Sequence, residues 1–144
     1  MYMLNRLLPY LFVLILLSPL TTAHASESLE YKLATINAGG YVSKDHITVA
    51  RFRSLLNQLS ATFVEDKTQI ADMSVTALNL LKKEGVQESL INIMEGMNKL
   101  FYRRIENQKY AEYAAAYVTL RSKGQSHTEA IRGLQAILRG LGAQ

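Results

Sequence analysis

The sequence predicts an all-α protein, a compact bundle of five or six helices around a long central helix or helix pair, after a cleaved signal peptide. Apolar residues recur at helical spacing, and no segment shows the alternation typical of strands. The chain has no cysteine, so its stability depends on an apolar core and not on disulfides. The stretch from Gln87 to Lys123 contains no proline and one glycine, Gly96. Because it is apolar on two faces, we expect neighbouring helices on both sides.

The N-terminus has the pattern of a secretory signal peptide. Residues 1–6 carry one arginine, and residues 7–20 form an apolar run that is broken by Pro19. Ala23 and Ala25 supply the small side chains that signal peptidase recognises, so we expect cleavage before Ser26. The alternative is an uncleaved membrane anchor, but the run is shorter than the about 20 apolar residues that a spanning helix needs.

These features divide the chain into two parts. Residues 1–25 are predicted to be the signal peptide, and residues 26–144 a single helical domain. We expect the domain to be exported to the periplasm or secreted, with no stable membrane span after cleavage.

The first two helices follow from apolar spacing and from residues that begin or end helices. Leu29, Leu33 and Ile36 predict a short helix that begins at a serine and ends at the glycine pair 39–40. A second helix follows Asp45, which is a good N-cap residue. Its apolar positions hold helical spacing and are Val49, Phe52, Leu55, Leu56, Leu59 and Phe63.

A third helix is predicted after the segment 63–66. Asp66 and Gln69 have the spacing of a capping box, with aspartate in place of the usual serine or threonine. The helix ends at Gly85. Because no glycine or proline forces a break after Phe63, one continuous helix over residues 46–84 remains the alternative.

The central segment and the last helix complete the bundle. A single helix over residues 87–123 would be about 55 Å long, which exceeds the width of a compact domain of this size. A break is therefore expected at the polar run 106–109, although the choice between one helix and two stays open. Gly124 ends the segment, and Ser126 with Glu129 forms a capping box for the last helix. The core is predicted to include Phe52, Leu56, Leu59, Leu90, Met94, Phe101, Leu134 and Ile137.

Catalytic and metal-binding patterns are not found in the sequence. The two histidines of the predicted domain, His46 and His127, each lie beside an expected N-cap, where polar residues are ordinary. There is no His-Glu-x-x-His, no cysteine ligand and no Gly-x-Ser-x-Gly. We therefore expect no enzyme activity, no metal site and no cofactor.

Tyrosines and cations gather in the second half of the chain. From Gly96 onward, eight basic residues stand against three acidic ones, an excess too small to predict a nucleic-acid partner. The candidate binding residues are Tyr102, Arg103, Arg104, Tyr110, Tyr113, Tyr117 and Arg121. One interpretation is that the rings pack partly buried and the cations are solvated. The other is an aromatic, basic face that holds a peptide, an aromatic metabolite or an acidic group.

These features lead to two hypotheses of function. The first is an exported, non-enzymatic helical module that binds a protein or peptide partner through the Tyr-rich, basic face. The alternative is a small-molecule or lipid-binding helical bundle of the periplasm, with its ligand between the central helix and its neighbours. Homo-oligomerisation is left open.

Overall fold

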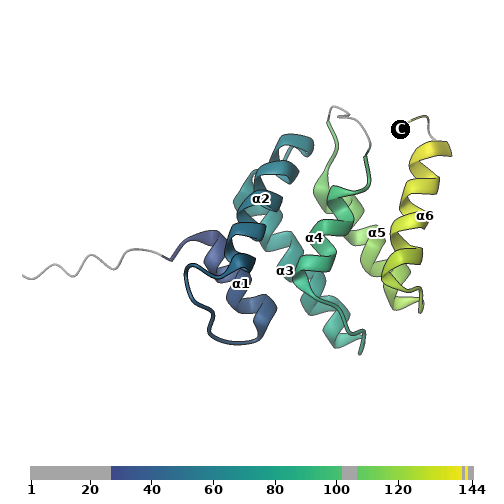
Figure 1. Ribbon diagram of the computed structural model, residues 1–144. Coiled ribbons are helices and arrows are strands. Elements are labelled where there is room, and N and C mark those ends of the chain that lie inside the picture. The colour runs from purple at the N-terminus through teal and green to yellow at the C-terminus, as the bar shows by residue number, and fades with distance from the viewer. Residues whose placement is uncertain (1–26, 102–106, 141, 143–144) are drawn as a thin grey trace, which may run out of the picture.

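The computed structural model describes residues 27–101, residues 107–140 and residue 142. Over this part of the chain it contains six α-helices and no strand, which confirms the predicted all-α class (Figure 1). The helices are α1 (Leu29–Ala38), α2 (Ile47–Thr62), α3 (Lys67–Lys83), α4 (Leu90–Asn98), α5 (Tyr110–Ser122) and α6 (His127–Gly140).

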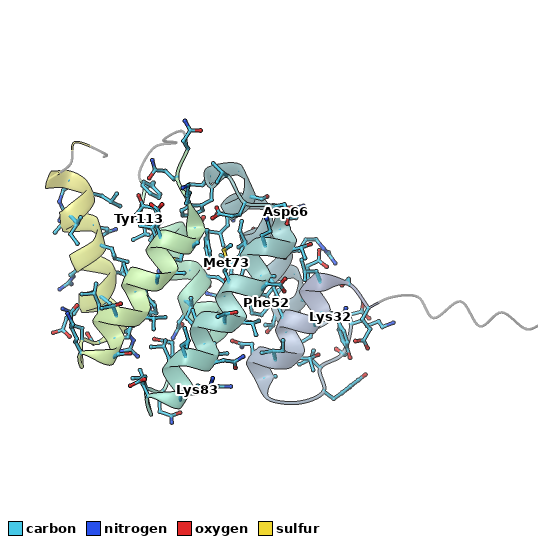
Figure 2. The ribbon with its side chains drawn as sticks, turned by 180° about the vertical axis from the view of Figure 1, so that it is seen from behind. Lys32, Phe52, Asp66, Met73, Lys83 and Tyr113 are labelled. Carbon is cyan, nitrogen blue, oxygen red and sulfur yellow. The ribbon has the colours of Figure 1, made fainter. Side chains whose placement is uncertain are left out.

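The helices form two layers. Each helix packs against the next one in sequence and against the next but one, as in a row of stacked helical hairpins. The layer of α2, α4 and α6 faces the viewer in Figure 1, and α3 and α5 of the other layer come to the front in Figure 2. Helix α4 contacts all five of the others, so it is the central helix of the bundle.

The segment 87–123 is a helix pair. Helix α4 ends at Asn98, with Lys99 as its C-cap, and α5 begins at Tyr110. The predicted break at 106–109 is confirmed by Asn107, whose φ of 59° lies in the left-handed region that asparagine tolerates better than most residues. The first of the two helices ends earlier than the polar run suggested, because the chain turns at Lys99 and buries Leu100.

Three of the four helix starts predicted from capping residues agree with the structure, including that of α1, which Ser28 caps. The Asp66 capping box is present, with both hydrogen bonds to Gln69 at 2.9 Å, and it separates α2 from α3. In the Ser126 box, the Glu129 carboxylate accepts from the Ser126 N–H at 2.7 Å. The predicted N-cap of α2 was wrong by one residue. His46 caps the helix by accepting from the Thr48 N–H, and Asp45 lies outside it.

The apolar core runs through both layers. Phe52, Leu56, Leu59, Leu90, Met94 and Leu134 are buried as predicted. Phe101 is half-buried. Ile137 was predicted wrongly, since it is 58% exposed. Among the described helices, α6 lies at the end of the array and packs on α4 and α5 alone, so its buried arc is too narrow to include Ile137.

None of the described helices is both long enough and apolar enough to span a membrane.

Candidate functional site

Among the described residues, the tyrosines of the predicted Tyr-rich face do not form one open surface. Tyr110 and Tyr117 are fully buried, and Tyr113 is half-buried, so the expectation that their rings form a contact face is corrected. The physical reason is that α5 packs against α3, α4 and α6, and the side of α5 that these helices cover carries Tyr110 and Tyr117. Arg121 is also largely enclosed, with 11% of its side chain exposed. The candidates Tyr102, Arg103 and Arg104 lie outside the described residues.

Tyr110 belongs to an aromatic cluster between α2 and α5. Its ring meets Phe63 edge-on with 5.2 Å between ring centroids, and Phe63 also contacts Phe101 and Tyr113. The Tyr110 hydroxyl lies 2.6 Å from Ser74 Oγ, which also donates to the Ile70 carbonyl. Burial raises the pKa of Tyr110, so its hydroxyl stays protonated. This tyrosine therefore fixes α5 on α3.

Glu65 caps the start of α5 from a distant part of the chain. Its side chain is almost completely buried, and its two carboxylate oxygens accept from the Tyr110 N–H at 2.8 Å and the Ala111 N–H at 3.2 Å. Lys109, the N-cap residue of α5, makes no side-chain capping bond. Glu65 thus satisfies the free N–H groups that the local sequence leaves unpaired.

Tyr117 and Arg121 belong to a second polar cluster, which we call the Glu88 network: Glu88, Tyr117, Arg121 and His127. Glu88 precedes α4, and only 3% of its side chain is exposed. Glu88 Oε2 accepts from the Tyr117 hydroxyl at 2.7 Å and lies 3.0 Å from Arg121 Nη2. The Tyr117 hydroxyl also lies 2.8 Å from His127 Nδ1. The network thus joins the segment before α4 to α5 and to the first residue of α6.

Glu88 is ionised in this setting. Burial alone raises the pKa of Glu88, but hydrogen bonds from Tyr117, the Ser89 backbone and Asn92, with the charge of Arg121, outweigh it and lower the pKa. Both carboxylate oxygens therefore act as acceptors. Since the Tyr117 hydroxyl has one proton and gives it to Glu88, it is an acceptor toward His127. Neutral His127 must then carry its proton on Nδ1.

Helices α3 and α5 lie side by side on the face seen in Figure 2. An apolar groove runs between them on their outer side. Its volume is about 170 Å³, and none of its lining residues is charged. The α3 side contributes longer side chains, including Leu80, which is 44% exposed, and the α5 side is mainly alanine. The lining residues of this α3–α5 groove are Met73, Thr76, Ala77, Leu80, Ala111, Ala114, Ala115 and Val118.

Other hollows on the surface have a different character. One lies at the α5–α6 turn, is lined by Lys123, Gln125, Glu129 and Arg132 among others, and measures about 460 Å³. Another, of about 520 Å³, lies between α2 and α3 and includes Glu65 and Asp66. Both are open depressions lined mostly by polar and charged side chains. No group of three or more potential metal ligands occurs among the described residues.

Sequence reasoning missed most of these features. Glu65 and Glu88 contact residues far away in the chain, so no local spacing identifies them. One feature of the groove is visible in the sequence, because Met73, Ala77 and Leu80 fall at helical spacing. The same spacing is typical of core residues, so it does not identify a groove.

In the part of the chain that the structure describes, the fold and these sites define the class: a small protein of stacked helical hairpins with an apolar groove and two buried polar clusters. A family model, MoxZ, matches residues 23–138, a range that contains α1 to α5 and most of α6. The chain belongs to the MoxZ family, which associates it with methanol oxidation systems. No curated protein and no solved structure matches the chain.

Proposed function

We propose that this protein is an exported, non-enzymatic accessory module of a methanol oxidation system, and that it binds a protein partner through the α3–α5 groove. The observation that carries the proposal is the groove itself, an uncharged apolar hollow on the outside of the bundle. Exposed apolar hollows of this kind are typical of protein-contact sites. The family supplies the setting, because it associates the chain with methanol oxidation.

The size of the groove favours a side chain of a protein over a free ligand. Drug-sized molecules occupy pockets of about 300–1,000 Å³, whereas a cavity of about 150 Å³ holds one benzene ring. The groove, at about 170 Å³, therefore matches one large apolar side chain. Interfaces are often dominated by one such anchor in a pocket. The alternative of a small-molecule or lipid-binding bundle is less well supported, since the larger depressions are lined mostly by polar and charged residues.

The occupant that fits is an apolar helical segment. From Met73 to Leu80 the groove follows about 10 Å of helix, or about two turns. Ala111, Ala114 and Ala115 form its low wall, and small side chains let another backbone approach closely. We infer that the partner presents two turns of helix with one bulky apolar residue at the centre.

Non-enzymatic action is supported by the use of the buried polar groups. Glu65 accepts from the start of α5, and Glu88 accepts from four donors within the fold. Groups committed in this way stabilise the structure and are not presented to a substrate.

The test compares two charge insertions on α5. Ala115→Glu places a carboxylate in the groove, and Thr119→Glu places one on the exposed surface one turn later, outside the groove. Both variants and the wild type are used to capture partners from the exported fraction of methanol-grown cells, and affinity is then measured with the purified partner. Ala115→Glu should weaken binding more than about tenfold, while Thr119→Glu changes it less than about twofold.

Equal affinity for the two variants would refute the groove as the contact surface. Melting temperatures of both variants check that neither is unfolded. Native mass spectrometry of the purified chain tests the alternative, because a ligand-binding bundle would retain a small molecule.

A further inference from the structure

The Glu88 network has a property that the proposed function does not use. Its histidine is the first residue of α6, so one titratable ring joins the last helix to the rest of the bundle. The His127 ring packs edge-on against the Tyr117 ring, with 5.7 Å between centroids. It also lies against α4 at Gly96, where a Cβ atom would come within 2.9 Å of His127 Cε1.

The proton count in the network decides where His127 gains a second proton. Nδ1 already carries a hydrogen that is donated to the Tyr117 oxygen, so the second proton must go to Nε2. The side chain of His127 is 29% exposed, which gives solvent access to part of the ring. Acidification therefore converts the neutral His127 ring into a cation, and its hydrogen bond from Nδ1 to the Tyr117 oxygen is kept.

The positive charge on protonated His127 would lie close to several other charged groups. From α5 it faces Arg121 and the uncharged Tyr117, and it also faces Glu95 of α4 and Lys99, the C-cap of α4. Glu88, before α4, lies 3.7 Å from Nδ1. A cation at the first residue of a helix also opposes the helix dipole.

Neither nearby carboxylate is free to compensate this charge. Glu88 already pairs with Arg121, and Glu95 pairs with Arg51 of α2. Within α6, Glu129 accepts from the Ser126 N–H in the capping box. Burial lowers the pKa of His127, and the effect of Glu88 in the opposite direction does not reverse this.

We propose that His127 is a pH-responsive contact that holds α6 on α4 and α5 when neutral and loosens α6 when it is protonated. The sign follows from linkage. A histidine with a lowered pKa in the folded state is protonated first in the released state, so its contribution is present above about pH 6.5 and is lost as the pH falls. Loosening of α6 would expose Gly96 of α4 and the Tyr117 side of α5, a second surface separate from the α3–α5 groove.

Hydrogen exchange of the full mature chain tests this proposal. The quantity measured is the amide protection of α6 divided by that of α2, between pH 7.5 and pH 5, because a ratio cancels the intrinsic pH dependence of exchange. The reference helix α2 is itself capped by a histidine, His46, so both proteins carry His46→Asn, which keeps a capping side chain. The parent protein carries His46→Asn alone, and the protein compared with it carries both His46→Asn and His127→Asn. The asparagine amide at position 127 can still donate to the Tyr117 oxygen.

The expected result is a fall of at least about threefold in the α6/α2 ratio on acidification, seen only where His127 is present. A constant ratio in the parent would overturn the proposal, as would an equal fall in the His127→Asn protein. NMR titration of the His127 ring in the parent gives a second readout, which does not require the His127→Asn protein to fold. A titration midpoint at or above that of an ordinary histidine would also overturn it.

Discussion

Neutralising Glu65 should destabilise the protein although the substitution keeps its shape. The Glu65 carboxylate accepts from two N–H groups at the start of α5, at 2.8 and 3.2 Å. In Glu65→Gln the amide has one oxygen, so one N–H loses its partner, and the side-chain NH₂ group then faces a donor. The favourable interaction between a negative charge and the helix N-terminus is lost as well.

The magnitude follows from these two losses. An unpaired buried donor costs about 1–3 kcal/mol, and the charge at a partly buried helix end adds about 0.3–2 kcal/mol. We therefore expect Glu65→Gln to lower the free energy of unfolding by about 1–5 kcal/mol. Glu65→Ala, which leaves both N–H groups unpaired and a void at the start of α5, should cost somewhat more.

Urea unfolding followed by circular dichroism at pH 7 measures the effect. The matched control is Asp72→Asn, which removes one carboxylate charge from an exposed position of α3 and should change the stability by less than about 0.5 kcal/mol. If Glu65→Gln loses no more stability than Asp72→Asn, the capping argument is refuted.

Three further outcomes are expected. Gly96→Ala should cost about 1–3 kcal/mol, because its Cβ would lie 2.6 Å from Ile131 Cδ1, whereas Gly133→Ala in α6 has its nearest neighbour at 3.7 Å and should be neutral or stabilising by up to about 1 kcal/mol. Thermal melts distinguish the two, and equal losses would contradict the packing explanation. Tyr117→Phe should cost more than Tyr110→Phe, since it leaves Glu88 and His127 without the hydroxyl between them, while Ser74 keeps its bond to a backbone carbonyl; the reverse order in urea would count against the network. Mass spectrometry of the exported protein should find Ser26 at the N-terminus, and a mature chain that retains residues 7–20 would contradict cleavage.

Much of the local structure was predictable because its causes are local. Helical spacing identified the helices, and the boxes at Asp66 and Ser126 mark helix starts because both partners lie within four residues of each other. The core positions on α2 and α4 followed for the same reason. Ile137 shows the limit, since its exposure depends on the end position of α6 in the array.

The candidate site was less predictable because α5 is apolar on opposite faces. Tyrosines occupy one face and alanines the other, and either face is suitable for a core. The structure buries Tyr110 and Tyr117 and leaves Ala111 and Ala115 exposed in the groove. The tyrosines are inside because their hydroxyls find partners in Ser74 and Glu88, which lie far away in the sequence.

The sequence by itself determined the helical class, the helix starts that depend on nearby residues and most of the core. Tertiary structure alone decided which side of α5 faces solvent, which acid caps it and which charges His127 meets. The physical reason is range: periodicity and capping act within a turn or two of helix. Burial and the pairing of buried polar groups depend instead on segments such as Glu65 and Tyr110, which only folding brings together.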